Sequence, residues 1–513
     1  MDQITEHKLN AACNDFVAGI DPLKVCDLAT SCHPKKVACH ILGEWKRGSY
    51  NICIPVVFED DGKSEKWVVR IPLLPRLAFP EEKMRSEIAT MKYITEKTTI
   101  PIPRIHGYSI TGDNILGLPF LIIEYIEGNT LHSMKFNDFR RKKREHLYAQ
   151  LGDIYIQLFR QQFDRIGALT LTEGGNWTFT NTYPLTIDIN EQEISGLDAR
   201  CFLNLNHTFQ STIDYIYSIV RLISNDFHRG RESILNENDA QLYLYSIYAC
   251  QSILMEWVQP EFNHGPFVLM HGDLRPPNII VDDNLNIISV RPRLGMEPHS
   301  SSSNISDKIS FIGYLAAANS FCFELGCQEY TFHNPEKLPR QELPLTKHWW
   351  DLSSMQDYLI PLGLLAPHYF SNIYWKALDS WYYGPNGKER VQTFFGLDIR
   401  KPDHQAVRKK VEEYESYKKE REELGIEATS VRIATTAEEL SQLAKALKKR
   451  EIEKAEAISR NAHSPQQQLP FPQLAYQSPD ISTTEGRRAV GTWLFIAFST
   501  MSAVCIISGR LIK

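Results

Sequence analysis

Residues 269–281 read Leu269-Met270-His271-Gly272-Asp273-Leu274-Arg275-Pro276-Pro277-Asn278-Ile279-Ile280-Val281. An apolar run leads into a His-x-Asp triplet, and Asn278 follows Asp273 after five positions. A positioned aspartate can accept a proton from a hydroxyl group, and an asparagine amide offers an oxygen to a hard cation. This pattern predicts a catalytic loop. The alternative, a buried turn in which Asp273 and Asn278 only cap backbone groups, stays open.

The loop has the residue order of the catalytic loop of kinase-like phosphotransferases. In such a loop the aspartate faces the acceptor hydroxyl, and the asparagine holds a metal ion. We therefore expect Asp273 and His271 to be the catalytic residues, with Asp273 as the base and His271 as its support. Asn278 is the expected ligand of Mg²⁺.

Residues suited to a nucleotide precede this loop in a consistent order. A turn of small residues lets backbone N–H groups approach phosphates, and a strand cation paired with a helix carboxylate fixes them. Arg70 lies in a predicted strand and Glu87 in the following predicted helix, although each taken singly is also typical of a surface charge. The residues expected to bind the cofactor are Gly48, Ser49, Arg70, Glu87, Glu124 and Tyr125.

Taken together, these segments resemble the aminoglycoside phosphotransferase-like (phosphotransferase enzyme) family, in its fungal-type branch. The resemblance covers roughly residues 40 to 425 and implies a two-lobed protein-kinase-like fold, ATP with Mg²⁺, and phosphorylation of a small-molecule hydroxyl. It does not identify the acceptor. The matching segments are Arg47 to Asn51, Trp67 to Pro72, Glu87, Phe120 to Gly128, and His271 to Val281.

The chain departs from this family where a second metal-binding aspartate belongs. The family's strand after the asparagine ends in Ile-Asp-Trp-Glu, whereas this chain continues Val290-Arg291-Pro292-Arg293. Loss of that carboxylate should lower the rate by several powers of ten, because the metal neutralises charge on the transferred group. We hypothesise that residues 292–345 are read in a shifted frame. If they are not, the alternatives are a pseudokinase-like binding module or a membrane-tethered interaction protein.

The predicted fold class is α+β, with a small β-rich N-lobe, a larger helical C-lobe, a C-terminal helical tail and a single transmembrane helix. Alternating strand patterns, helical spacing and a linker rich in Pro and Gln suggest the boundaries. The expected parts are an N-terminal helical segment (1–40), the N-lobe (41–127), the C-lobe with its catalytic loop at 269–282 (128–425), the helical tail and linker (426–488) and the transmembrane helix (489–509).

Charge and cysteine usage restrict the partners and the compartment. A net charge of −6 without a long basic run gives no reason to expect nucleic acid. Ten cysteines without regular spacing are typical of reduced thiols in the cytosol. The uncharged run 489–509 would be about 31 Å long as a helix, enough for a bilayer core. We therefore expect a cytosol-facing protein anchored to a membrane through 489–509, with a buried C-terminal helix as the alternative.

Overall fold

The small lobe is built on a six-stranded antiparallel sheet in a computed structural model of the chain. The structure describes residues 1–134, 139–204, 206–258, 260, 263–269, 274, 276–290, 360, 363–364 and 367–427. The strand order is β1-β3-β4-β6-β5, with β2 paired to β3. The strands are β1 (Cys39–Ile41), β2 (Lys46–Arg47), β3 (Asn51–Asp60), β4 (Lys63–Pro72), β5 (Ile105–Ser109) and β6 (Phe120–Glu124).

A two-residue turn joins the long strands β3 and β4. Asp61 and Gly62 both have positive φ, 47° and 77°. Asp-Gly favours this mirror-image turn, whose twist matches that of the flanking strands. The turn lies between Asp60 and Lys63, which are the last paired residues of the two strands.

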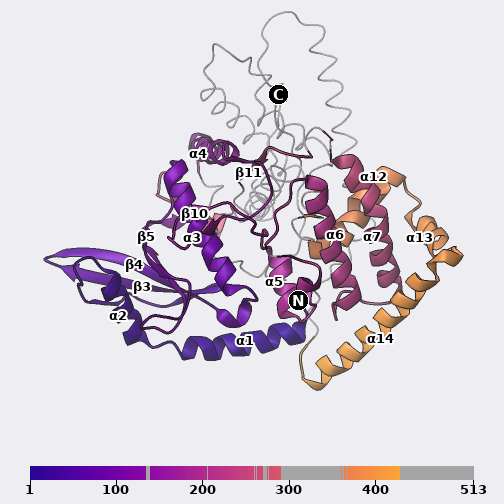
Figure 1. The fold of residues 1–513 in the computed structure, drawn as a ribbon, viewed down its shortest axis with the longest axis horizontal. Helices are drawn as coiled ribbons and strands as arrows, with labels where there is room; N and C mark the ends of the chain where they lie inside the picture. Colours follow the sequence, from indigo (N-terminus) through magenta and orange to yellow (C-terminus); the bar gives the residue numbers. More distant parts are fainter. Residues whose placement is uncertain are drawn as a thin grey trace, which may run out of the picture.

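Both faces of the sheet are covered, so its strands are apolar on both sides. On one face Trp67 and Val69 pack against Val25 and Leu28, with helices α1 (Gln3–Ala18) and α2 (Pro22–Cys32) as the cover. On the other face lies α3 (Pro80–Lys97), whose Ile88 packs in a cluster with strand residues of β6. Figure 1 shows α1 and α3 on either side of the strands.

The second lobe is mainly helical. Helix α4 packs on the β12–β13 hairpin, and α6, α7 and α14 share the largest apolar cluster. Its helices are α4 (Arg141–Phe159), α5 (Ile187–Ile194), α6 (Thr212–Arg229), α7 (Glu237–Trp257), α11 (Phe370–Ile373), α12 (Asp379–Tyr383), α13 (Gly387–Gly396) and α14 (Lys401–Glu423), with a π-helical turn, η9 (Tyr374–Leu378). Its short strands are β7 (Asn129–Thr130), β8 (Gln162–Phe163), β9 (Thr170–Leu171), β10 (Trp177–Thr178), β11 (Phe267–Val268), β12 (Ile279–Val281) and β13 (Ile287–Val290).

Helix α1 connects the two lobes. Near its start, the Gln3 side chain donates a hydrogen bond to Glu232 Oε1 at 2.7 Å, in the segment between α6 and α7. Further along, Asn10 accepts one from Arg76 at 2.6 Å, directly after β4. Figure 1 shows α1 running from the sheet toward α5 and α6. The helix thus limits how far the lobes can move apart.

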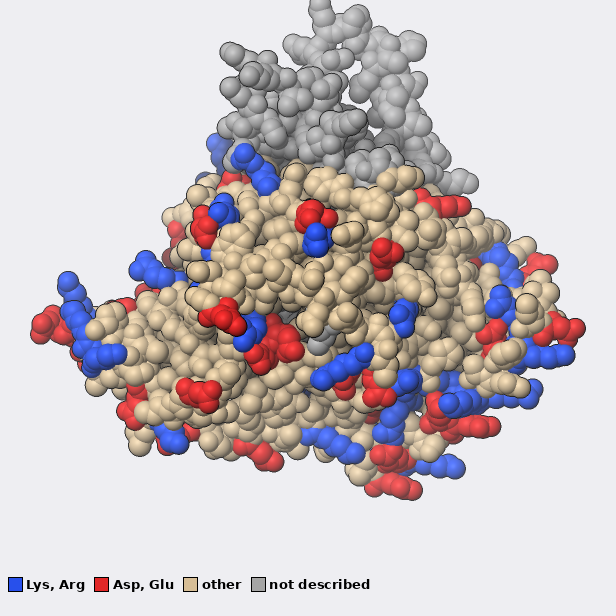
Figure 2. Space-filling view, in the orientation of Figure 1, with Lys and Arg blue, Asp and Glu red and all other residues tan. Residues whose placement is uncertain are grey.

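Charged side chains of both signs are interspersed on the face seen in Figure 2. No gathering of basic residues stands out there, in keeping with the net charge of −6. The expectation that nucleic acid is not a partner stays a prediction.

The kinase-like α+β fold is confirmed, but the transmembrane part of the prediction is corrected. Within the described residues no helix is both long enough and apolar enough to cross a membrane. Residues 489–509, on which the transmembrane helix, the membrane partner and the membrane-anchored location all rested, lie outside those residues. The prediction rested on residues 489–509 being uncharged and long enough to cross a bilayer. The structure gives no support to a membrane anchor.

Gly128 lies between β6 and β7, at the point where the chain leaves the six-stranded sheet and pairs with β12. Gly128 has φ +151°, and an added Cβ would lie 2.7 Å from Ile280 Cγ2 and 3.1 Å from the Val281 carbonyl oxygen. Gly196 also has positive φ, +72°, but nothing lies within 4 Å of its Cβ position.

We expect Gly128→Ala to lower the free energy of unfolding by about 1–3 kcal/mol, because the methyl group overpacks the crossing. Gly196→Ala is the matched control, and should show only the backbone strain of about 1 kcal/mol. Urea unfolding of both variants measures the difference. Equal losses would mean that the contacts with β12 do not matter.

Candidate active site

A buried ion pair joins the central strand of the small lobe to its helix. Arg70 on β4 places Nη1 2.5 Å from Oε1 of Glu87 on α3, and the two side chains are only 2% and 6% exposed. The order of strand cation and helix carboxylate expected from the sequence is therefore realised as a contact. Neither residue is an isolated surface charge.

Lys83 joins this pair and was missed in the sequence. Its Nζ lies 3.0 Å from Oε2 of Glu87, one helical turn further along α3. The same ammonium donates to Oδ1 of Asn51 at 3.1 Å. The i, i+4 spacing of Lys83 and Glu87 places them on one face of the helix, and this spacing was readable in the sequence.

The two neighbouring cations hold Glu87 ionised. Burial alone would raise the pKa of Glu87, but Arg70 and Lys83 outweigh burial and hold that pKa below its usual range. Burial lowers the pKa of Lys83, and Glu87 opposes this only in part. Burial also acts to lower the pKa of Arg70, but the Glu87 carboxylate outweighs burial, so the pKa of Arg70 lies above its usual range. Two cations thus share one carboxylate.

The turn before β3 lies beside this cluster. The Gly48 N–H donates to the Asn51 carbonyl oxygen at 2.8 Å and closes the turn. Ser49 is 6% exposed, and its Oγ has no hydrogen-bond partner in the described structure. A Cβ on Gly48 would meet only Asn51 O at 3.6 Å, so the fold itself does not require glycine there. A buried hydroxyl without a partner next to clustered cations fits a polyanionic group such as a phosphate.

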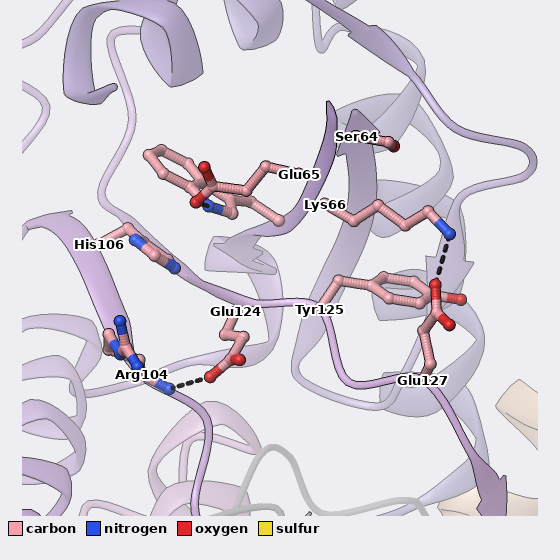
Figure 3. A pocket seen from close by; sticks show the side chains of 9 residues that line it. Ser64, Glu65, Lys66, Arg104, His106, Glu124, Tyr125 and Glu127 are labelled. Carbon is pink, nitrogen blue, oxygen red and sulfur yellow. Dashed lines mark hydrogen bonds and ion pairs between the residues drawn. The ribbon is translucent and has the colours of Figure 1, made fainter. Parts of the chain in front are cut away.

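Glu124 and Tyr125 lie at the end of β6, beside a pocket of about 440 Å³ (Figure 3). Glu124 is in register with Trp67, whose side chain packs on the α1–α2 face of the sheet. Arg70 lies three residues beyond Trp67 and points to the opposite face. The structure therefore does not bring the Glu124 carboxylate together with Arg70 and Glu87.

The charged side chains that line this pocket form hydrogen bonds and ion pairs with neighbouring residues of the pocket. Glu124 Oε2 accepts from the Arg104 N–H at 3.3 Å, and Lys66 pairs with Glu127. The carboxylate of Glu65 accepts from Trp67 Nε1 at 2.7 Å. Cofactor binding by Glu124 and Tyr125 stays a prediction that rests on their place at the end of β6.

The predicted catalytic loop is described only in part. Asn278 ends a short 3-10 turn, η5 (Pro276–Asn278), directly before β12, and is 8% exposed. His271 and Asp273 lie outside the described residues, as does everything from 291 to 359, where the second metal aspartate would stand. Their roles stay predictions.

The described residues do not assemble a metal site by themselves. Within the described ranges no group of three His, Cys, Asp or Glu side chains could hold an ion. Asn278 is the predicted ligand that falls in this part of the chain, and one amide oxygen is not a sufficient set for Mg²⁺.

A sheet covered on both faces, a buried Arg–Glu pair between strand and helix, and a helical second lobe define a kinase-like fold. Residues 55–179 match the family described as the phosphotransferase enzyme family. This part of the chain is therefore similar to that family, in agreement with the resemblance stated from the sequence.

Curated relatives are similar over short stretches. The chain is 40% identical over 65 residues to altered inheritance of mitochondria protein 9 of Clavispora lusitaniae, covering 12% of the chain and 11% of the relative. It is 29% identical over 118 residues to the protein of that name in Zygosaccharomyces rouxii, covering 21% and 19%. A subtelomeric hrmA-associated cluster protein of Aspergillus fumigatus is 26% identical over 92 residues, covering 18% of each chain. The aligned stretches thus span about a fifth or less of these relatives.

Solved structures are similar at low identity. A GDP and kanamycin complex of an aminoglycoside phosphotransferase, APH(2")-IIIa, is 14% identical with a TM-score of 0.30, over 70% of this chain and 94% of that one. An ethanolamine kinase of Plasmodium vivax is 16% identical with a TM-score of 0.27, over 72% and 84%.

We expect Glu87→Gln to destabilise the protein by about 3–5 kcal/mol at neutral pH, because it leaves two cations without their carboxylate. The folded pKa of Glu87 lies below its ordinary value near 4.5, so its stabilisation is present above that value. The difference between variant and wild type should therefore shrink as the pH falls through the folded pKa. Denaturant unfolding at several pH values measures it.

Glu81→Gln is the matched control on the same helix. Glu81 is 53% exposed and pairs with Arg85 at i, i+4, an arrangement worth less than about 1 kcal/mol. If both variants lose equally little stability, the buried pair does not hold the lobe together.

Proposed function

We propose that this chain is an ATP-dependent phosphotransferase that transfers a phosphoryl group to a hydroxyl of a small molecule. The observation that carries the proposal is the buried Arg70–Glu87 pair beside the turn at Gly48 and Ser49. The family match over residues 55–179 supports it. The acceptor is left open.

Each group has a separate role in this proposal. The backbone and hydroxyl of Ser49 bind phosphate oxygens, and the Arg70–Glu87 pair fixes helix α3 against the sheet beside them. Asp273 orients the acceptor hydroxyl and takes its proton as the phosphoryl group leaves the nucleotide, and His271 supports the loop. Mg²⁺ held in part by Asn278 would neutralise charge on the phosphates when bound.

A second candidate function follows from one observation. The strand β13 ends at Val290, and the sequence continues Arg291-Pro292-Arg293 where the family has its metal aspartate. This favours a pseudokinase-like module that binds nucleotide and does not transfer phosphate. The two candidates share the small-lobe site and differ in the segment after β13.

Mg²⁺-dependent ATP hydrolysis by the full chain separates the two. For a phosphotransferase we expect turnover that Asp273→Asn lowers by about 10²–10⁴-fold, since a general base contributes that much. ATP affinity, measured by calorimetry, should stay unchanged in this variant. Binding without turnover in the wild type would favour the binding module, and absence of ATP binding would reject both functions.

The buried hydroxyl of Ser49, which has no hydrogen-bond partner in the described structure, gives a second test of nucleotide binding. Ser49→Ala should leave stability unchanged or raise it by about 1 kcal/mol, because no hydrogen bond is lost. ATP affinity should nevertheless fall several-fold. Thr212→Val is the control: its buried Oγ1 also has no partner in the described structure, but it lies at the start of α6 in the other lobe. Unchanged ATP affinity in Ser49→Ala would remove this turn from the nucleotide site.

A further inference from the structure

Among the described residues, the cluster of Arg70, Lys83 and Glu87 carries two positive charges and one negative charge. Arg70 and Lys83 both contact this single carboxylate, at 2.5 Å and 3.0 Å. The largest charge influences on Lys83 come from Glu87, which stabilises its charged form, and from Arg70, which opposes it. Lys83 shares the Glu87 carboxylate with Arg70, so its ammonium is suited to accept a further anion.

The two cations differ in how accessible they are. Arg70 is 2% exposed, and its guanidinium is enclosed between the sheet and α3. The Lys83 side chain is 21% exposed. An ammonium on a flexible stem can turn toward a ligand, whereas a guanidinium locked by a carboxylate cannot.

Lys83 is also the cation that reaches the phosphate-binding turn. Its Nζ donates to Asn51 Oδ1 at 3.1 Å, and the Asn51 carbonyl oxygen closes the turn by accepting from Gly48. Between them lies Ser49, whose buried hydroxyl has no partner in the described structure. Lys83 Nζ has three N–H groups, and the two contacts above use two of them.

We propose that Lys83, from helix α3, is the cationic side chain that contacts the phosphates of a bound nucleoside triphosphate, and that Arg70 is a positioning residue that holds Glu87. In this arrangement the phosphate-contacting cation lies on the helix and not on the strand. The inference rests on the proposed function, because it assigns a role within the same nucleotide site.

The experiment measures ATP and adenosine affinities of the full chain by calorimetry. Lys83→Gln should weaken ATP binding by about ten- to hundredfold, the value of one charge-assisted hydrogen bond, and leave adenosine binding unchanged. Lys83→Arg should restore part of the ATP affinity. Arg85→Gln is the control: Arg85 lies on the same helix, is 35% exposed and pairs with Glu81. It should change neither affinity.

Two outcomes contradict the role of Lys83 and leave the proposed function standing. One is a folded Lys83→Gln that binds ATP as tightly as the wild type. The other is an equal loss of ATP and adenosine affinity, which indicates a merely structural role. If the wild type does not bind ATP, the proposed function fails, and the inference fails with it.

A second measurement needs no variant and stays decisive if Lys83→Gln does not fold. Acetylation of lysines in the wild type is followed by mass spectrometry with ATP, with adenosine and without ligand. We expect ATP to protect Lys83 several-fold and adenosine to leave it unprotected. Equal labelling of Lys83 under all three conditions contradicts a phosphate contact.

Discussion

The small lobe depends on one carboxylate. Glu87 contacts Arg70 on the central strand and Lys83 on its own helix, and through Lys83 it is linked to Asn51 at the start of β3. The sheet, the helix and the turn before β3 therefore share one electrostatic centre. Because this centre is buried, each partner must keep its geometry or leave an uncompensated charge in a poorly solvated place. The packing of α3 on the sheet and the shape of the turn follow from the same requirement.

The two faces of the sheet differ in the helices that cover them and in the residues that they carry. Helices α1 and α2 seal the face that carries Trp67, so that face is committed to packing. The opposite face carries Arg70 and receives α3, and the charged groups gather there. Helix α1 also reaches the second lobe through Gln3 and Glu232. A helix that seals one face thus links the two lobes without occupying the face that carries the charged cluster.

The sequence predicted the parts whose pattern is local. Alternating strand patterns predicted a β-rich N-lobe, and the order of Arg70 and Glu87 suggested the pair that the structure shows. Lys83 was missed because its role depends on Asn51, which is far away in sequence and reaches it only after folding. Glu124 was assigned from its place at a strand end, but its side-chain direction depends on register with Trp67, which no local pattern encodes. The transmembrane helix was inferred from length and lack of charge, and these criteria do not establish a span.

Binding and transfer are separable in this chain because they depend on different segments. The residues suited to hold phosphates lie between Gly48 and Glu87, in one lobe and around one buried carboxylate. The residues predicted to act on the acceptor begin at His271, and the departure from the family comes after Val290. A change in the later segment leaves the charges around Glu87 untouched. For the proposed function, nucleotide affinity alone therefore cannot distinguish an enzyme from a binding module, whereas turnover can.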